Sequence, residues 1–245
     1  MITKKYQLCA VDAGARFLYG GIEWVKLTTA RGDGGTLAIA ANSVFNRAFD
    51  DDNCNDWRAS SLRRELNGPF LDALVAEGAD RDAFMEFESD LTADDGMTDY
   101  GTATDRVALL TCDLYRRFRR LIPLVDEWCW TLTPFSCLPE YRNYARNVYS
   151  SGTLLSYYAY NGGNGVRPLC NFKSEILVSV IDEEATAEEA RQDTIGEAAD
   201  AILQTLDEFD PEIRGDAMAA ALARMFAEVI DAQKSRTDDT GAAEG

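Results

Sequence analysis

The 245-residue sequence contains no histidine, and this gap removes several kinds of chemistry at once. Without imidazole there is no Ser-His-Asp or Cys-His catalytic machinery, no histidine proton shuttle and no His-ligated zinc or iron. An enzyme would have to rely on carboxylates, Tyr, Lys or Cys alone. The sequence therefore favours a protein that is not an enzyme.

Long apolar runs are also missing. No stretch approaches the ~20 residues that a membrane-spanning helix needs. The first five residues, MITKK, lead into a short mixed segment instead of the apolar stretch and cleavage site of a secretory signal. Apolar residues still make up 46% of the chain, which is enough to fill a substantial core. We expect a cytoplasmic globular protein with no membrane partner.

Cysteine pairs typical of metal sites are absent too. None of the six cysteines forms a C-x-x-C pair, and most lie in apolar runs such as LCAV and LLTC. In a cytoplasmic protein this pattern favours buried free thiols over disulfides or zinc. The oxygen-rich run Asp50–Asp56 lacks the Gly and Glu positions of an EF-hand, so a solvated loop is favoured over a calcium site. We predict no metal and no cofactor.

Acidic residues, by contrast, are abundant. The chain has 42 acidic and 24 basic residues, a net charge of −18. Residues 77–105 hold ten acids and one base, and residues 182–245 hold 18 acids and five bases. Such blocks repel nucleic acid and favour a basic protein partner, unless they only keep the protein in solution. The residues predicted to form this acidic partner-binding face are Asp94, Asp95, Asp99, Glu188, Glu189 and Asp193.

The patterning up to residue 181 indicates a mixed α+β structure. Short apolar or alternating runs between Gly-rich turns predict strands at 6–11, 22–27, 36–41, 107–110, 128–133, 147–150, 153–160, 166–172 and 175–181. Helical spacing predicts two short helices meeting at Gly68-Pro69, a brief helix over 81–88 and another over 112–121. Asn67 is placed to end the first helix in the left-handed conformation. The four tryptophans are large enough to share one core.

After residue 182 the composition shifts to Ala, Glu and Asp, with apolar residues at a 4-3-4-3 spacing on either side of Pro211. This spacing predicts an antiparallel helical hairpin over 182–233 and a flexible tail over 234–245. A lone hairpin is marginal in water, so it must dock on the domain 1–181, on a second copy or on a partner. We expect a monomer or a weak homodimer.

Several motifs occur in an order that resembles one uncharacterised bacterial and phage domain family. They are FLYGGIEWVKL (17–27), WRASSLRRELNGPFLDAL (57–74), TDRVALLTCDLYRRF (104–118), WCWTLTPFS (128–136) and GVRPLCNF (165–172). The resemblance covers residues 6–181 and implies a C-type-lectin-like fold, shared with formylglycine-generating enzymes and with the variable proteins of diversity-generating retroelements. The three later cysteines do not reproduce the reactive pair of the formylglycine-generating enzymes, and the lectin Glu-Pro-Asn triplet is absent. These folds host unrelated tasks, so the resemblance implies a fold and not a function.

Tyrosine and asparagine crowd residues 141–164. Tyr offers broad contact area with a polar tip, and Asn adapts its hydrogen bonding, as in antibody loops. Because side chains on a strand alternate between faces, about half of these residues should pack inward. From this set we predict Tyr144, Tyr158, Asn161 and Asn164 as partner-binding residues.

Two functions follow as hypotheses. The first is a non-enzymatic macromolecule-binding protein, encoded by a phage or mobile element, that uses the Tyr/Asn-rich surface. The second is an acidic nucleic-acid mimic that occupies the basic groove of a host defence protein, as anti-CRISPR-like inhibitors do. The arginines between Arg116 and Arg120 either grip phosphate or, as we favour, form a solvated face or counter one acidic block. Arg167 is predicted to donate to backbone carbonyls between strands.

Overall fold

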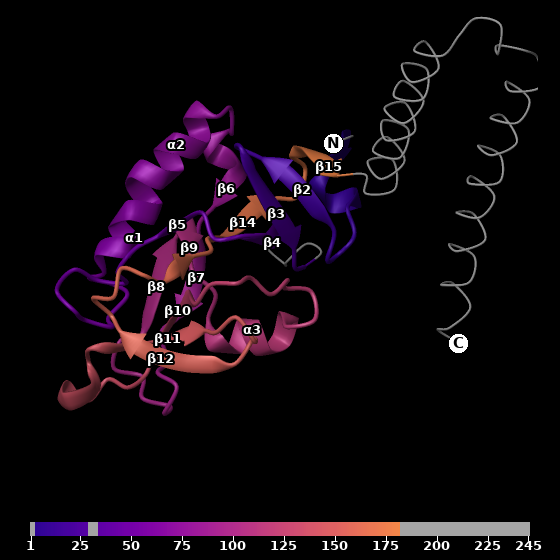
Figure 1. Cartoon of the computed structure of the whole chain (residues 1–245). Helices are drawn as coiled ribbons and strands as arrows, with labels where there is room; N and C mark the ends of the chain where they lie inside the picture. The colour runs from indigo at the N-terminus through magenta and orange to yellow at the C-terminus, as the bar shows by residue number, and fades with distance from the viewer. Residues whose placement is uncertain (1–2, 29–33, 182–245) are drawn as a thin grey trace, which may run out of the picture. The chain divides into compact units, whose positions relative to one another are not determined.

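The computed structural model describes residues 3–28 and 34–181 (Figure 1). The chain divides into two units, Met1–Thr186 and Ala187–Gly245, and the description below concerns the first. The predicted hairpin over 182–233 and the predicted tail over 234–245 lie outside the described residues. So do the predicted acidic contacts Glu188, Glu189 and Asp193.

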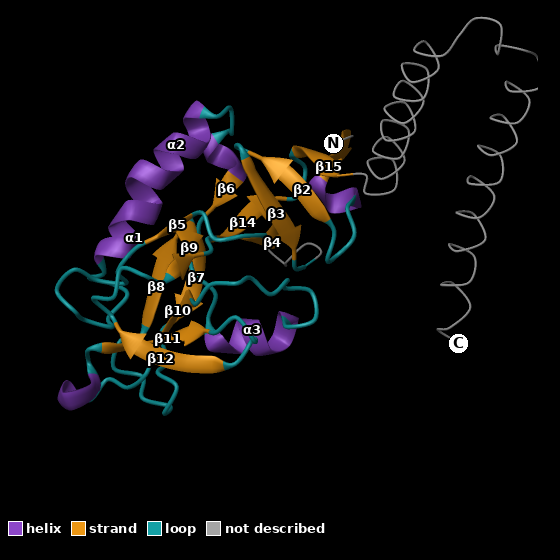
Figure 2. Cartoon of the chain, in the orientation of Figure 1, coloured by secondary structure: helices purple, strands orange, loops and turns teal. Residues whose placement is uncertain are grey.

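The first unit is an α+β structure dominated by strands, as the sequence pattern predicts (Figure 2). Its larger sheet has the order β1-β15-β2-β3-β4-β14-β6, with β9 also pairing with β14. These strands are β1 (Thr3–Gln7), β2 (Arg16–Tyr19), β3 (Ile22–Lys26), β4 (Gly35–Ala40), β6 (Phe84–Met85), β9 (Val107–Ala108), β14 (Leu169–Lys173) and β15 (Leu177–Ile181). The first and last strands of the unit are antiparallel neighbours, with Thr3 opposite Ile181. This pairing closes the unit on itself.

A second sheet has the order β12-β11-β10-β13-β5. Its strands are β5 (Phe45–Asn46), β10 (Cys129–Pro134), β11 (Tyr144–Val148), β12 (Leu154–Tyr158) and β13 (Gly165–Val166). Every residue of β10 is buried, whereas β11 alternates between buried and half-buried residues. A separate hairpin pairs β7 (Phe87–Asp90) with β8 (Thr102–Asp105). The second sheet thus runs from a buried centre to an outer hairpin, β11–β12.

The main helical segment joins α1 (Ser61–Glu65) to α2 (Leu71–Ala76) through a π-helical turn, η2 (Leu66–Phe70). Two helices meeting at Gly68-Pro69 were predicted, but residues 61–76 form one continuous helical segment that passes through Pro69. A π turn bonds one residue further along the chain, and a helix can absorb a proline by such a local adjustment. The Ser60 side chain caps the start by accepting from the amides of Leu62 and Arg63.

The remaining helix, α3 (Cys112–Phe118), confirms the expected helix at 112–121 and ends three residues earlier. Three 3-10 turns, Leu8–Ala10, Arg81–Ala83 and Pro139–Tyr141, complete the helical elements of the described residues. The prediction of a helix over 81–88 is wrong, because after one 3-10 turn the chain enters β6 and β7. Phe84 and Phe87 are buried there, so packing of the sheet overrides the weak local helical pattern.

Asn67 does not cap a helix end as predicted. It lies inside the π turn, and its side-chain oxygen accepts from the amides of Arg106 and Val107 at 3.1 Å each. Its amide nitrogen donates to the carbonyls of Arg63 (3.1 Å) and Val107 (2.8 Å). Asn67 therefore ties the helical segment to β9, with all four of its hydrogen-bonding positions in use.

One continuous core joins the two larger sheets, and three of the four tryptophans belong to it. Trp24 packs edge-on against Phe172, while Phe49 lies between Trp57 and Trp130. Trp128 is 36% exposed, so the expectation that all four share the core is wrong. It follows the exposed loop residues Asp126 and Glu127, which leave it at the surface end of β10.

Two buried cations hold neighbouring segments through backbone carbonyls. Arg167 donates to the carbonyls of Ala40 (3.1 Å), Ala41 (2.9 Å) and Pro123 (3.0 Å), which confirms its predicted role. Lys26 is fully buried and donates to the carbonyls of Leu8 and Val11. Burial lowers the pKa of both groups.

Within the described ranges, no helix has the length and apolar character to cross a membrane.

Candidate functional site

An exposed aromatic cluster lies at the end of the β11–β12 hairpin. We call it the tyrosine cluster, and it consists of Phe135, Tyr141, Tyr144, Tyr158 and Tyr160. Tyr144 on β11 lies directly opposite Tyr158 on β12, and their ring centroids are 4.6 Å apart. Tyr158 stacks on Tyr160 at 5.6 Å, with an interplanar angle of 27°. Two of the predicted contact residues, Tyr144 and Tyr158, are therefore brought together.

The hydrogen-bond pattern of the hairpin explains this closeness. The amide of Ala159 donates to the carbonyl of Asn143, and the amide of Tyr149 donates to that of Thr153. The Tyr144–Tyr158 pair falls between these bonded positions, and the side chains of non-hydrogen-bonded antiparallel pairs approach most closely. A hydrogen bond with Tyr158 raises the pKa of Tyr144.

The cluster remains accessible although its rings touch. Tyr141 is 42% exposed, Tyr158 38% and Tyr160 56%, whereas Tyr144 and Phe135 are half-buried. Large aromatic side chains gathered in this way on a surface mark a contact site more strongly than scattered ones. Tyr adds a hydroxyl to each ring, so the surface offers both apolar area and hydrogen bonds.

A fully buried asparagine, Asn55, fixes the loop beneath these rings. Its side-chain nitrogen lies 2.9 Å from the carbonyl of Ser136, 2.8 Å from that of Tyr144 and 3.3 Å from that of Tyr141. Its side-chain oxygen accepts from the Tyr100 hydroxyl at 2.9 Å. One side chain thus holds the loop before β11 in place. Sequence reasoning missed Asn55 because its role depends on partners about 80 residues away.

The segment after β12 is fastened in the same way. Asn53, at a φ of 58°, accepts from the amide of Tyr160 at 3.2 Å, and the amide of Asp50 donates to the carbonyl of Ala159. Asp50 also accepts from the amides of Cys54 (3.1 Å) and Ser61 (2.9 Å). Its carboxylate is therefore occupied by the local backbone. Among the described residues no group of three or more acidic or cysteine side chains could hold a metal ion.

The two predicted asparagines have structural positions. Asn164 is 2% exposed, and its side-chain oxygen accepts from Asn147 at 3.0 Å. It is not available to a partner, which corrects its prediction as a partner-binding residue. Asn161 is half-buried, and its oxygen accepts from the amide of Gly163 (2.9 Å) and the side chain of Asn164 (3.3 Å). Both asparagines shape the turn after the cluster because Asn side chains bond readily to the nearby backbone.

A second aromatic group packs on the opposite face of the hairpin. Trp128 contacts Tyr149 at 5.0 Å and Tyr157 at 5.5 Å, both edge-on. Tyr157 neighbours Tyr158 in sequence and therefore faces the other way, as strand alternation requires. The hairpin carries aromatic side chains on both faces.

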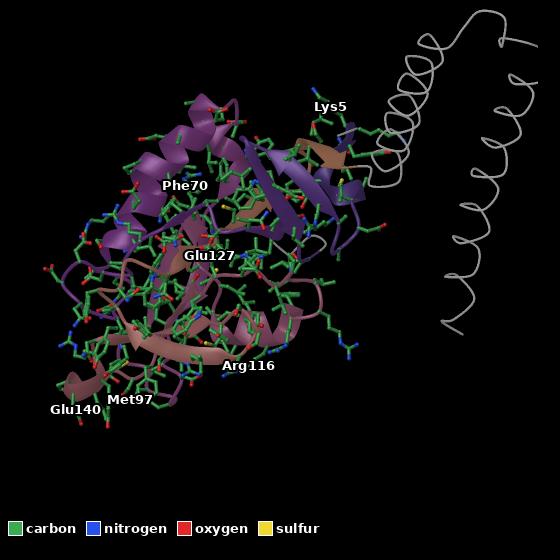
Figure 3. All side chains as sticks on the ribbon, viewed as in Figure 1. Lys5, Phe70, Met97, Arg116, Glu127 and Glu140 are labelled. Atoms are coloured by element: carbon green, nitrogen blue, oxygen red, sulfur yellow. The ribbon has the colours of Figure 1, made fainter. Side chains whose placement is uncertain are left out.

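The acidic loop after β7 is partly neutralised from within. Asp94 pairs with Arg116 at 3.0 Å and lies 3.5 Å from Arg146, while the Asp95 carboxylate accepts from the Met97 amide at 3.1 Å. Asp99 is exposed. Figure 3 labels Arg116 and Met97, whose side chains lie in this part of the unit. Arg116 thus counters one acidic block, as favoured above, and Asp94 and Asp95 are less available to a partner than predicted.

A cleft of about 470 Å³ lies between the β7–β8 hairpin and the start of α3. Carboxylates of Glu88, Asp90, Asp94 and Asp113 line it, together with a single cation, Arg116. Glu88, Asp90 and Asp113 are exposed. The cleft therefore favours a cationic group.

The buried thiols offer little nucleophilic chemistry. Cys112, Cys129, Cys137 and Cys170 are buried, Cys54 is half-buried, Cys9 is exposed, and all six are free. Burial raises the pKa of Cys129 to about 11 and that of Cys170 well above its ordinary value. A thiol reacts as its thiolate, so these groups are held in the unreactive form at neutral pH.

Comparisons of the chain with known proteins add no assignment to this geometry. No protein-family model matches it. No curated protein sequence and no solved structure matches it either.

Proposed function

We propose that this protein is a non-enzymatic binding protein whose tyrosine cluster contacts a macromolecular partner, most simply a protein. The observation that carries this proposal is the contact of exposed tyrosine rings on a loop system fixed by Asn55. Rigid aromatic side chains provide contact area with little loss of conformational entropy on binding. Raised thiol pKa values and the lack of histidine support a role other than catalysis.

We further propose that the first unit has a C-type-lectin-like fold and acts in the cytoplasm. The antiparallel pairing of β1 with β15 supports this fold, because it closes the unit where the resemblance begins and ends. With such a fold, the tyrosine cluster would lie in the region that forms the variable surface in the variable proteins of diversity-generating retroelements.

A pull-down with matched variants tests the proposal. The double variant Tyr144→Ala/Tyr160→Ala removes two rings of the cluster, and Tyr6→Ala serves as control because Tyr6 is 44% exposed on β1, away from the cluster. The wild type and the control should recover the same partner from a host lysate, and the double variant should lose it. Equal recovery by all three proteins would contradict the proposal. Calcium-dependent binding to a glycan array would overturn the choice of a protein partner.

The acidic cleft favours a second candidate, a nucleic-acid mimic that engages a basic protein. Carboxylates of Glu88, Asp90 and Asp113 replace phosphates in this hypothesis, and such an association weakens steeply with salt. The charge-reversal variant Asp90→Lys/Asp113→Lys should release a basic partner that low salt retains. Partners that resist both high salt and charge reversal would count against mimicry.

A further inference from the structure

Most sheet edges in the described part of the chain are short or charged, and one is neither. The edge strands β5 and β6 have two residues each, β1 carries Lys4 and Lys5, and the β7–β8 hairpin carries Glu88 and Asp90. Such features protect an edge from pairing with another chain. The remaining edge, β12, has five residues with the sequence LLSYY. From residue 148 to residue 166 the chain has no charged residue and no proline.

The outward backbone groups of β12 follow from its pairing with β11. Along an antiparallel pair, hydrogen-bonded and non-hydrogen-bonded residue pairs alternate. Because Asn143–Ala159 and Tyr149–Thr153 are hydrogen-bonded pairs, the odd-numbered residues of β12 direct their backbone groups to β11. Leu154, Ser156 and Tyr158 therefore point their amides and carbonyls away from the sheet. Arg146 donates to the carbonyl of Leu154 at 3.3 Å, and Asn161 donates to that of Tyr158. Ser156 has no backbone partner among the described residues.

We propose that this edge is a self-association surface, on which β12 of a second copy pairs antiparallel about Ser156. The strand is complementary to itself in this register. Leu154 of one copy lies opposite Tyr158 of the other on one face, and Leu155 lies opposite Tyr157 on the other face. Aromatic and aliphatic side chains opposed across antiparallel strands stabilise a sheet. The pairing covers the edge-facing sides of Leu155 and Tyr158, 39% and 38% exposed, and leaves the sheet face that carries the tyrosine cluster uncovered.

The net charge of −18 does not prevent this contact. The Debye length is about 8 Å at physiological ionic strength, so distant surface charges act weakly across an uncharged edge. Arg146, which reaches the Leu154 carbonyl at this edge, is paired with Asp94. A second copy supplies an equally uncharged strand of matching length, which makes it a better occupant than an unrelated charged peptide.

Pairing of this kind has a consequence for binding. A two-fold axis normal to the joined sheet leaves the same face of both copies on the same side. Two tyrosine clusters then face one direction and can engage one multivalent partner with a gain in avidity. This consequence rests on the proposed function, whereas the pairing itself does not.

Sedimentation velocity of the full chain over about 1 to about 100 μM tests the pairing, because small interfaces give weak affinities. The wild type should shift from monomer to dimer with concentration. Ser156→Pro removes an outward amide and leaves the β11 ladder intact, so it should weaken the dimer at least tenfold. Ser156→Ala retains that amide and should dimerise like the wild type. Leu155→Lys places a charge at the edge and should also weaken the dimer.

The outcomes separate the pairing from the proposed function. A wild type that stays monomeric, a dimer that survives both Ser156→Pro and Leu155→Lys, or association beyond the dimer would overturn the pairing. Near-ultraviolet circular dichroism shows whether each variant retains its fold. If Ser156→Pro does not fold, the oligomeric state of Leu155→Lys decides whether the pairing exists. Loss of the dimer with retention of the partner by monomeric Ser156→Pro would leave the tyrosine-cluster proposal standing.

Discussion

At the scale of single residues, Asn55 has the largest effect on the candidate site. Replacing it with Ala leaves the buried Ser136 carbonyl without its donor and the buried Tyr100 hydroxyl without its acceptor, whereas the Tyr144 carbonyl keeps the amide of Phe135. Each unsatisfied buried group costs about 1–3 kcal/mol, so we expect Asn55→Ala to lower the free energy of unfolding by about 3 kcal/mol. Denaturant titration followed by tryptophan fluorescence measures this loss. The control Tyr100→Phe removes the hydroxyl that bonds to the Asn55 oxygen and to Arg142, but keeps the bonds from the Asn55 nitrogen, so it should cost less. Equal losses would show that the loop does not depend on those bonds of Asn55.

Cys129 makes stability depend on alkaline pH. Burial raises its pKa from 9.0 to about 11, so the folded protein keeps the proton where the unfolded chain has lost it. The neutral thiol therefore contributes stability that is complete below pH 9 and is lost as the pH rises towards 11. The loss amounts to at most about 2–3 kcal/mol for this group. Denaturant titrations from pH 8 to 11 should show a flatter decline for Cys129→Ala than for the wild type. The control Cys9→Ala, which removes an exposed thiol, should lose stability with pH as the wild type does. If Cys129→Ala shows the same decline as the wild type, Cys129 is not the cause of the alkaline loss of stability.

The asparagines show which roles of single residues could not be predicted from the sequence. Composition pointed to the region of the cluster and to Tyr144 and Tyr158, because Tyr carries its contact chemistry in its own side chain. An Asn takes its role from its neighbours in space. Asn164 is buried against Asn147, and Asn55, outside the Tyr-rich run, organises the loop. No local pattern separates these cases.

At the scale of elements, the turn of the β11–β12 hairpin depends on Gly152. Its φ is 80°, and an added Cβ would lie 2.8 Å from the Tyr115 hydroxyl and 2.9 Å from an Arg119 nitrogen. Gly152→Ala should therefore combine backbone strain with crowding and cost about 2–3 kcal/mol. Gly96→Ala is the matched control, since Gly96 has a φ of 90° and nothing within 4 Å of its Cβ position. Thermal denaturation should rank the two variants; equal costs would mean that crowding at Gly152 contributes nothing.

Elements with strong local patterns were predictable, and those set by packing were not. The runs IEWVK and CWTLTP predict strands, and β3 and β10 confirm them. The prediction of a helix over 81–88 is wrong because a segment of eight residues is too short for its periodicity to distinguish a helix from a strand. The pairing of β1 with β15 joins the two ends of the unit, and no local signal in either segment indicates it.

At the scale of the whole molecule, an excess of 18 negative charges dominates the electrostatics. In most described ion pairs at least one side chain is exposed, and in Arg81–Asp72 both are. Exposed pairs contribute about 0–1 kcal/mol each. Arg63–Asp105 is an exception, since its carboxylate is 3% exposed and is screened little by salt. Repulsion among the excess carboxylates should therefore respond to salt more strongly than the ion pairs do.

This balance predicts that salt stabilises the protein. Raising NaCl from about 20 to about 300 mM shortens the Debye length severalfold and should relieve roughly 1 kcal/mol of repulsion, a rise in Tm of about 2–4 °C for a chain of this size. Tryptophan fluorescence reports on the first unit alone, because all four tryptophans lie between residues 24 and 130. KCl should have the same effect as NaCl if screening is the cause, whereas a difference would indicate binding of a specific cation. A Tm that falls with salt would show that attraction within ion pairs outweighs the repulsion, and the acidic surface would then be largely neutralised from within, as Asp94 already is by Arg116 and Arg146.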